Sequence, residues 1–370
     1  MRAIIDLAVA EEALRWHSSD NRLGVVHSKV AGDSIILESS SDTMWRRSVL
    51  PARDTEDGEV RFSLARIMLQ LKTVLKATEL RIEAPNKGRG NVVTTVGRST
   101  SSTPIMADIS TFWRPATQPE EIAEVGADDL KWAFRAARTA AANPNATGGE
   151  AYKSVLVTIQ DSRLSTVATD AYRLAFATVE CMASKDEEFR VIPDPFIKSL
   201  LLMGDPVVVI RQGGHLGVKG DRHMALMTSL DVQAPATGKV ISKAKMNPHA
   251  VTMEVAELKA ALKGMATDMD GKITMNFFHD YVVLANASSA SNAVGRTEIE
   301  VEASVNMELV DTQVGVNSNF LTSLLDAVRT PKIEMRLLAQ KGIMMTLLEF
   351  EGSKSDTDFV GVLSLSKATK

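Results

Sequence analysis

The chain has 370 residues, of which 45% are hydrophobic and 24% charged, a composition typical of a folded protein with two or three domains. Its formal net charge of −4 gives no general attraction to nucleic acid, so any contact with DNA requires basic residues gathered in one place. No apolar run reaches the roughly 18–20 residues of a membrane span. The single cysteine, Cys181, can form no internal disulfide, and the first residues lack a secretory cleavage pattern. These features predict a cytoplasmic protein without membrane contact.

The first third of the chain carries two amphipathic segments among strand-like runs. The first helix is expected in LAVAEEALRW, residues 7–16, and the second in RFSLARIMLQLKTVLKATELRI, residues 61–82. Runs such as SIILES and VVTTVG have the β-branched character of strands.

The middle and last thirds repeat this order more clearly. Each predicted first helix has apolar residues on one face: Leu130, Ala133, Phe134 and Ala137 at i, i+3, i+4 and i+7 in one, and Val255, Leu258, Leu262 and Met265 at i, i+3, i+7 and i+10 in the other. PDPFIKSLLLMGDPVVVI and VNSNFLTSLLDAVRTPKIEM predict the second helices and the strands that follow. The copies are about 125 residues apart, which predicts three repeated α+β domains, each with two helices against antiparallel sheet. The predicted domains are residues 1–120, 121–243 and 244–370.

Basic residues recur beside the apolar faces of these helices. Lys131 and Arg135 align with Lys259 and Lys263, in each case at i, i+4 spacing. A solvated helix face would explain any single pair. The same stripe in two repeats of an acidic protein instead favours sequence-independent contact with DNA phosphates. The predicted DNA-binding residues are Lys72, Lys76, Lys131, Arg135, Arg138, Lys198, Lys259 and Lys263.

The spacings of common catalytic and metal sites are absent from the sequence. There is no HExxH, and a lone cysteine excludes the usual zinc knuckles. His215, Asp221 and His223 could ligate a metal, but their glycine-rich stretch favours an exposed hairpin. Asp170 has no second carboxylate or histidine near it in the sequence. We therefore predict no catalytic residue, no metal and no cofactor. A metal-dependent nuclease or nucleotidyl-transfer enzyme using Asp170 remains the alternative.

Several segments resemble those of bacterial sliding clamps, the β subunit of the replicative DNA polymerase. ATDAYRLAFATVE, residues 168–180, resembles the family's A-T-D-G-[HY]-R-L-A motif. VGRSTSSTPIMADISTFWRP, PATGKVI and VGVNSNFLTSLLDAV resemble the end of the first clamp domain, the opening of the third and a helix of the third. Ala171 replaces the motif's glycine, the C-terminal FVGVLSLSKATK departs from the usual ending, and the first third matches poorly. The chain thus resembles a divergent clamp, of cellular or viral origin.

The resemblance implies a ring-forming homodimer that encircles duplex DNA and tethers the replicative polymerase without catalysing a reaction. An ATP-dependent clamp loader would open the ring. The strand around 98–107 of one chain would pair with the strand around 296–303 of the other, with Ile299 and Val301 at the dimer interface. An alternative is that the protein keeps the clamp fold only as a structural scaffold and binds no polymerase.

The resemblance also implies a pocket for partner peptides beside the 169–174 turn. Leu174, Val240, Phe320 and Val362 would supply its apolar surface, while Asp170 would fix the turn through local hydrogen bonds. A hairpin that belongs only to the core is the alternative. The implied pocket residues are Tyr152, Thr169, Ala171, Tyr172, Arg173, Leu174, Pro235, Lys239, Val240, Asn317, Phe320, Val360, Gly361, Val362 and Leu363.

Overall fold

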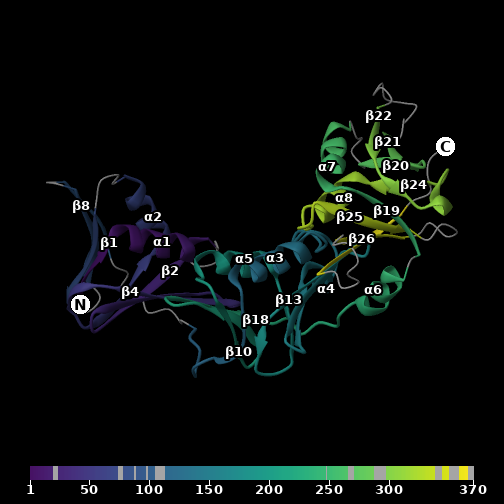
Figure 1. Cartoon of the computed structure of the whole chain (residues 1–370). Coiled ribbons are helices and arrows are strands. Elements are labelled where there is room, and N and C mark those ends of the chain that lie inside the picture. Colours follow the sequence, from purple (N-terminus) through teal and green to yellow (C-terminus); the bar gives the residue numbers. More distant parts are fainter. Residues whose placement is uncertain are drawn as a thin grey trace. The chain divides into compact units, whose positions relative to one another are not determined.

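The computed structural model describes residues 1–19, 24–73, 78–86, 89–96, 99–104, 113–246, 248–265, 271–286, 297–337, 344–349 and 358–365 (Figure 1). It forms two compact units, described separately below. The first unit comprises residues 1–128, 181–185 and 194–230. The second comprises residues 129–180, 186–193 and 231–370. No helix in these described ranges is long and apolar enough to cross a membrane.

The elements follow one order three times: a strand, a helix, several strands, a second helix and three more strands. The first repeat consists of β1 (Arg2–Asp6), α1 (Leu7–Ser18), β2 (Val25–Ala31), β3 (Ser34–Ser40), β4 (Met44–Pro51), β5 (Arg53–Glu56), β6 (Gly58–Ser63), α2 (Leu64–Thr73), β7 (Glu79–Asn86), β8 (Arg89–Val96) and β9 (Ser99–Pro104).

The second repeat adds a short helix and a 3-10 turn to the same order. It consists of β10 (Glu120–Val125), α3 (Ala127–Arg138), α4 (Glu150–Lys153), β11 (Val155–Gln160), β12 (Arg163–Thr169), β13 (Arg173–Glu180), β14 (Met182–Ala183), β15 (Glu187–Val191), α5 (Pro193–Ser199), η1 (Leu200–Leu202), β16 (Val207–Gln212), β17 (His215–Lys219) and β18 (His223–Thr228).

The third repeat follows a connecting helix, α6 (Thr237–Lys245). It consists of β19 (His249–Glu254), α7 (Val255–Gly264), β20 (Lys272–Phe277), β21 (Tyr281–Asn286), β22 (Glu298–Glu302), β23 (Ser304–Val305), η2 (Met307–Leu309), β24 (Gln313–Asn317), α8 (Ser318–Leu325), β25 (Lys332–Leu337), β26 (Met344–Glu349) and β27 (Phe359–Ser364).

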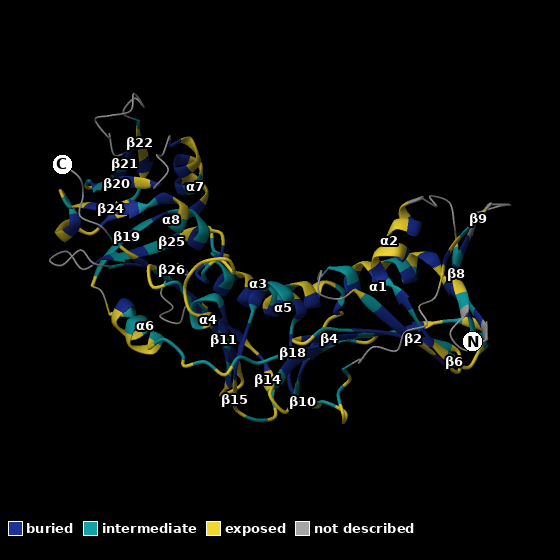
Figure 2. Ribbon diagram, turned by 180° about the vertical axis from the view of Figure 1, so that it is seen from behind, coloured by how far each residue is buried: buried dark blue, intermediate teal, exposed yellow. Residues whose placement is uncertain are grey.

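The first helices of the three repeats bury residues at the same spacing. The buried residues at their first, fourth, seventh and eighth positions are Leu7, Ala10, Ala13 and Leu14 in α1; Ala127, Leu130, Ala133 and Phe134 in α3; and Val255, Leu258, Ala261 and Leu262 in α7. This is one face of a helix with 3.6 residues per turn. In Figure 2 such helices are dark on the side facing a sheet and yellow on the other. The predicted apolar helix faces are confirmed.

The described residues of the first unit form two antiparallel sheets. One has the strand order β5-β1-β7-β8-β9. The other has nine strands in the order β14-β10-β16-β17-β18-β4-β3-β2-β6. Its two halves come from different repeats and join where β18 pairs with β4, with Leu226 opposite Trp45. Helices α1 and α2 contribute to a core that also takes side chains from β1, β3 and β6, including Ile5, Ile35 and Phe62.

The second unit is built in the same way. Its nine-stranded sheet has the order β15-β11-β12-β13-β27-β26-β25-β19-β23, and its smaller sheet the order β22-β21-β20-β24. The halves of the large sheet join where β13 pairs with β27, with Leu174 opposite Val362. This pairing brings the 169–174 turn next to β27, the last of the described strands.

The two compact units do not coincide with the three predicted domains. Each nine-stranded sheet takes strands from two successive repeats, so the continuous sheets hold parts of neighbouring repeats together. The α+β fold with three repeats is confirmed, whereas the boundaries at residues 120 and 243 stay a prediction.

Candidate functional site

Asp170 fixes the turn between β12 and β13. One carboxylate oxygen, Oδ1, accepts hydrogen bonds from the backbone N–H of Tyr172 at 3.0 Å and of Arg173 at 2.9 Å. The other, Oδ2, accepts one from Nε of Arg173 at 2.9 Å. Both oxygens therefore serve the turn, as an aspartate does when it replaces backbone partners in a tight bend.

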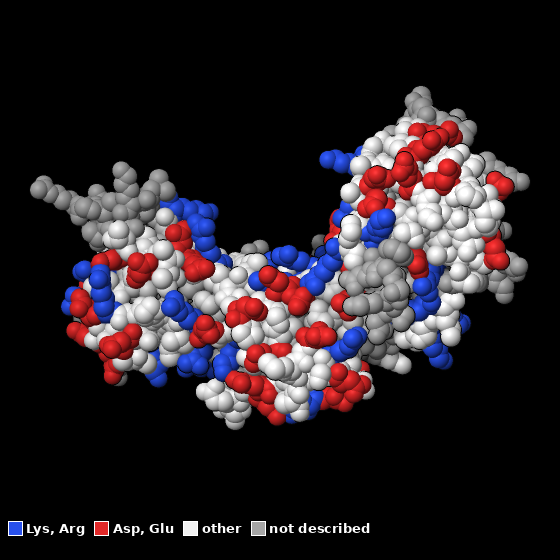
Figure 3. All heavy atoms as spheres, in the orientation of Figure 1, with Lys and Arg blue, Asp and Glu red and all other residues white. Residues whose placement is uncertain are grey.

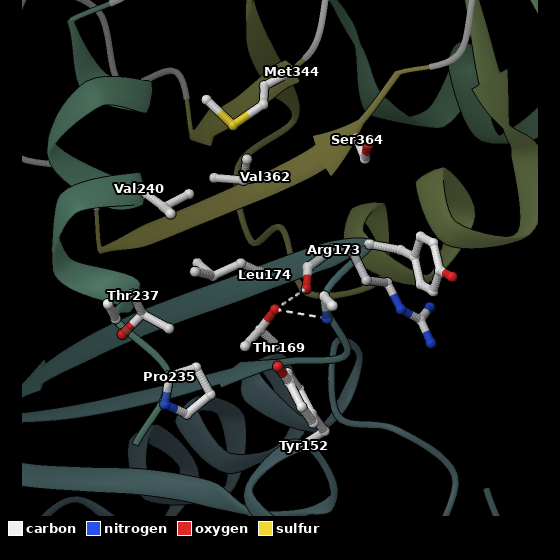
Figure 4. Close-up of a pocket in the computed structure, with 13 residues that line it drawn as sticks. Tyr152, Thr169, Arg173, Leu174, Pro235, Thr237, Val240, Met344, Val362 and Ser364 are labelled. Atoms are coloured by element: carbon white, nitrogen blue, oxygen red, sulfur yellow. Dashed lines mark hydrogen bonds between the residues drawn. The ribbon is translucent and has the colours of Figure 1, made fainter. Parts of the chain in front are cut away.

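Thr169 and Ala171 complete the turn. Oγ1 of Thr169 donates to the carbonyl of Arg173 at 2.7 Å and accepts from the N–H of Ala171 at 3.1 Å (Figure 4). Ala171 has φ of 75°, in the left-handed region where a side chain costs roughly 1–2 kcal/mol. These local hydrogen bonds hold a conformation that the glycine of the family motif would adopt without that cost.

A pocket with a volume of about 320 Å³ opens beside this turn. It lies within the second unit, where strands β13 and β27 run next to helix α6 (Figure 4). The residues that line it are Tyr152, Thr169, Ala171, Tyr172, Arg173, Leu174, Pro235, Ala236, Thr237, Val240, Met344, Val362 and Ser364. The size is at the lower end of the range for ligand sites in proteins.

The deep side of the pocket is a hydrophobic cluster. Leu174 and Val362 belong to this cluster together with Ala244, Leu348 and Val360, and Val240 packs against it. In Figure 4, Leu174, Val240 and Val362 lie close together, with Tyr152 and Pro235 on the opposite side. Tyr172 stands at the mouth with 66% of its surface exposed. The pocket thus offers an apolar interior and an aromatic ring at its entrance.

Most of the residues expected here line the pocket, and the others lie around it for identifiable reasons. Gly361 and Leu363 point to the opposite face of β27 from Val362 and Ser364, because side chains alternate along a strand. Val360 lies on the pocket's face of the strand but is buried in the cluster below it. Lys239 is exposed on α6.

Asn317 and Phe320 lie beyond the turn. The side chain of Asn317 caps α8 by accepting a hydrogen bond from the N–H of Phe320 at 3.0 Å. The guanidinium of Arg173 lies 4.4 Å from the centre of the Phe320 ring, and the Tyr172 ring lies 6.4 Å from it. Phe320 therefore supports two residues of the pocket wall without lining the cavity.

Four lining residues were missed from the sequence: Ala236, Thr237, Met344 and Ser364. Two of them had a usable signal. Ser364 follows Val362 by two residues on a strand, so alternation places both on one face. Thr237 begins a helix whose inward residues Val240 and Ala244 have i, i+4 spacing. Met344 comes from a separate strand, and nothing in its local sequence marks it.

The predicted basic residues lie on helices at varied exposure. Lys72, Arg135, Lys198 and Lys263 are exposed on α2, α3, α5 and α7, while Lys131 and Arg138 are partly buried on α3. Nζ of Lys259 lies 3.0 Å from a carboxylate oxygen of Asp326, so part of its charge is already neutralised. Lys76 lies outside the described residues. Figure 3 shows Lys and Arg side chains at the edge of the surface where Figure 1 labels α3.

The residues expected at the dimer interface lie on β22, at one edge of the four-stranded sheet. Their side chains point inward: Val301 is 3% exposed, and the tip of Ile299 lies under Gly264 of α7. Glu298, Glu300 and Glu302 face outward in the same strand. Figure 3 shows acidic side chains gathered over this part of the molecule.

The residues considered for metal chemistry have other partners. His215 stacks on Trp113 with ring centres 4.8 Å apart, and its Nδ1 lies 3.1 Å from the carbonyl of Gln212. His223 Nδ1 lies 3.0 Å from Oγ of Ser48, and burial, aided by the charge of Arg222, lowers the pKa of His223 to about 4. Within the described ranges, no three His, Cys, Asp or Glu residues are grouped as metal ligands.

No protein-family model matches the sequence, and no curated protein is similar to it in sequence. Solved structures are nonetheless similar over 100% of both chains. They include the DNA polymerase III subunit beta from Pseudomonas aeruginosa (TM-score 0.84, 16% identity) and a DNA polymerase sliding clamp from the same organism (0.82, 15%). A Helicobacter pylori beta clamp bound to a DNA ligase peptide gives 0.83 at 17% identity. The chain therefore has the fold of bacterial sliding clamps along its whole length, as the sequence motifs predicted.

Proposed function

We propose that this chain is a DNA sliding clamp, two copies of which close a ring around duplex DNA and tether a DNA polymerase. The observation that carries the proposal is the agreement in fold with DNA polymerase clamps over 100% of both chains, at a TM-score of 0.84. Such a ring would act by topology, so no catalytic group is required. Its place would be the bacterial cytoplasm, at the replication fork.

Basic helix faces supply the proposed contact with DNA. Arg135 and Lys263 are exposed on the first helices of the second and third repeats, and Lys198 on the second helix of the second. Long cations on helices can reach phosphates without reading bases, and such contacts carry no sequence information. A ring held in this way could slide.

Free strand edges supply the proposed ring closure. Among the described strands, β9 ends the sheet of the first repeat and β22 ends the small sheet of the third. An unpaired edge exposes a row of N–H and C=O groups that another strand can pair with. Pairing β9 of one copy with β22 of the other joins the copies head to tail, and a second identical joint closes the ring.

The pocket supplies the proposed site for partner peptides. Its apolar interior suits aliphatic or aromatic side chains, and the edges of the pocket offer hydroxyl groups from Thr237 and Ser364. The Helicobacter pylori neighbour was solved with a DNA ligase peptide. By analogy, segments of the polymerase and of an ATP-dependent clamp loader would bind here in turn.

The proposal is tested by topology on DNA. Protein loaded on nicked circular plasmid should remain bound through gel filtration and leave when the circle is linearised, because nothing but the closed circle retains a ring. Sedimentation should give a dimer close to twice 40.1 kDa. Equal retention on circular and linear DNA would refute the ring. A dimer that stays on circular DNA but binds no polymerase would support the alternative of a clamp fold that serves only as a scaffold.

A further inference from the structure

The turn beside the pocket has a counterpart in the first repeat. Strand β4 of the first repeat and β13 of the second are the strands by which each repeat joins the next. The turns that lead into them span residues 40–45 and 169–174, and in both the first residue pairs with the sixth. Oγ of Ser41 accepts a hydrogen bond from the N–H of Thr43 at 3.4 Å, as Asp170 does from the N–H two residues after it. The two turns are therefore built in the same way.

The last strand of the following repeat meets both turns in the same register. The N–H of Thr228 in β18 donates to the carbonyl of Thr43 at 3.0 Å, just as Ser364 in β27 donates to the second turn. The register of the strands then matches the pocket residues Leu174, Val362 and Met344 with Trp45, Leu226 and His215. The junction of the first and second repeats thus has the floor of a second pocket.

The connecting segments at the two junctions also match. Pro235, Ala236 and Thr237 line the pocket, and the same three residue types stand at 115–117, between the first and second repeats. Nε2 of Gln212, on β16, donates to the carbonyl and the hydroxyl of Thr117 at 2.9 and 3.1 Å. Because β16 belongs to the sheet that joins these repeats, the connecting segment lies against that sheet.

The ring of Trp113 fills the counterpart of the pocket. It packs against the hydrophobic cluster of Trp45, Ile210 and Leu226. It also stacks on His215, with ring centres 4.8 Å apart and 24° between the ring planes. At the second junction, the matching residues line an open cavity (Figure 4). An aromatic side chain of the chain itself therefore takes the place that the pocket leaves for a ligand.

Few contacts hold the segment that carries this ring. We call residues 113–117 the strap. Nε of Arg114 lies 2.9 Å from a carboxylate oxygen of Glu38, and its Nη2 lies 2.6 Å from Nδ1 of His27. Thr117 is bonded to β16 as described. The strap belongs to no helix or strand, so lifting it from the sheet would break no regular element.

Two buried polar atoms beside the strap lack a hydrogen-bond partner among the described residues. They are Nε1 of Trp45, a residue only 3% exposed, and Oε1 of Gln212. A buried donor or acceptor without a partner costs free energy, and such atoms are rare in folded proteins. The strap covers the apolar floor and leaves both atoms unsatisfied. A bound peptide would bring both a carbonyl for the indole and an N–H for the amide oxygen.

We propose that the junction of the first and second repeats is a second binding site for partner peptides, which the strap closes with Trp113 as an internal ligand. The inference rests on the proposed peptide pocket. The site takes an aromatic anchor, because its present occupant is an indole stacked on an imidazole over an apolar floor. In the wild type a peptide must first displace the strap, which weakens its binding relative to a site that is already open.

The first test counts peptides per chain. Isothermal titration calorimetry with a synthetic peptide that has one leucine and one phenylalanine as anchors should give one site in the wild type and two in Trp113→Ala. The second site should bind at least about tenfold more tightly than any second site of the wild type. Trp113→Phe is the matched control, because it keeps a ring on His215 and should keep one site. A folded Trp113→Ala protein with one site would overturn the proposal, whereas a wild type without any site would refute the pocket itself.

The second test locates the new site. In Trp113→Ala, adding Val240→Asp should remove the pocket and leave one peptide per chain, and adding His215→Asp should instead remove the new site. Two sites retained with His215→Asp would overturn the assignment. Arg114→Glu decides the matter if Trp113→Ala does not fold, because it sets a carboxylate beside Glu38 and repels the strap while every residue of the floor is kept. It should also bind two peptides per chain, and one site in the folded variant would contradict the proposal.

Discussion

Replacing Glu300 with proline should separate the two copies without disturbing the third repeat. Just before and just after β22, the carbonyl of Thr297 accepts from the N–H of Asn286 at 3.2 Å, and the N–H of Ala303 donates to the carbonyl of Asp280 at 3.0 Å. Hydrogen-bonded positions alternate along an antiparallel pair, so the N–H of Glu300 points away from β21. Proline there removes a donor only from the open edge, where it is tolerated.

The expected loss follows from the geometry of a closed ring. An edge pairing that loses one donor and leaves its acceptor unpaired costs about 1–3 kcal/mol. A ring of two copies has two identical joints, so dissociation into monomers carries this loss twice, about 2–6 kcal/mol. Since every 1.4 kcal/mol is about tenfold, the dimer dissociation constant should rise at least about thirtyfold.

Sedimentation velocity over a dilution series measures this constant directly. Glu300→Ala is the control, because it removes the same carboxylate and keeps the backbone N–H. Lysine at Val301 would be a poorer probe: that side chain is 3% exposed, so the substitution would destabilise the repeat itself. If Glu300→Pro and Glu300→Ala dimerise equally well while both stay folded, β22 is not the edge that joins the copies.

Three further predictions concern the pocket, the helix faces and the acid response. Val240→Asp, at a partly buried position that lines the pocket, should weaken binding of a fluorescent peptide with aliphatic and aromatic anchor residues at least about tenfold in anisotropy titrations. Exposed Met182→Asp is the control, and equal binding by both variants would place the site elsewhere. Changing Lys131, Arg135, Lys259 and Lys263 to glutamate should reduce the magnitude of the slope of log K against log salt for DNA by at least about two, the contribution of the exposed Arg135 and Lys263. An unchanged slope would mean that these helix faces contact only solvent. Burial lowers the pKa of His223 to about 4, so the unfolded chain binds this proton first as the pH falls below about 6.5. Stability should therefore drop by up to about 2 kcal/mol between pH 6.5 and 4, discounted for partial exposure, and His223→Gln should flatten that drop in thermal melts.

The inner faces of the helices could be predicted from the sequence because a helix buried on one side has apolar residues repeating about every 3.6 positions. Leu130 and Phe134 in α3 and Leu258 and Leu262 in α7 mark the helices with large apolar side chains. Helix α1 gave a weaker signal because Ala10 and Ala13 occupy two of the same positions. The buried residues of α1 keep the same spacing, but small alanine side chains differ less in hydrophobicity from the exposed residues around them.

The pocket could be predicted only where its residues belong to one motif. The hairpin from Thr169 to Leu174 carries its own turn chemistry, in which Asp170 bonds two backbone N–H groups, so its shape is local. Met344 lies on a strand that reaches the site through sheet order, and no period in its own segment shows that. Helix α6 was missed because its few inward residues are separated by lysines.

The side chains of β22 show why an alternating pattern fixes the two faces but not their use. The alternation in the sequence predicts Ile299 and Val301 on one face of the strand and the three glutamates on the other. The structure has the same two faces. An apolar face can cover either a neighbouring chain or the strand's own helix, and α7 already covers this one. What β22 can then offer another copy is its backbone edge and its glutamates. Two such edges from different copies would set like charges side by side, which is unfavourable, whereas β9 bears Ser, Thr and Pro. The glutamates therefore favour pairing with β9 over self-pairing, and so favour a head-to-tail joint that can close a ring.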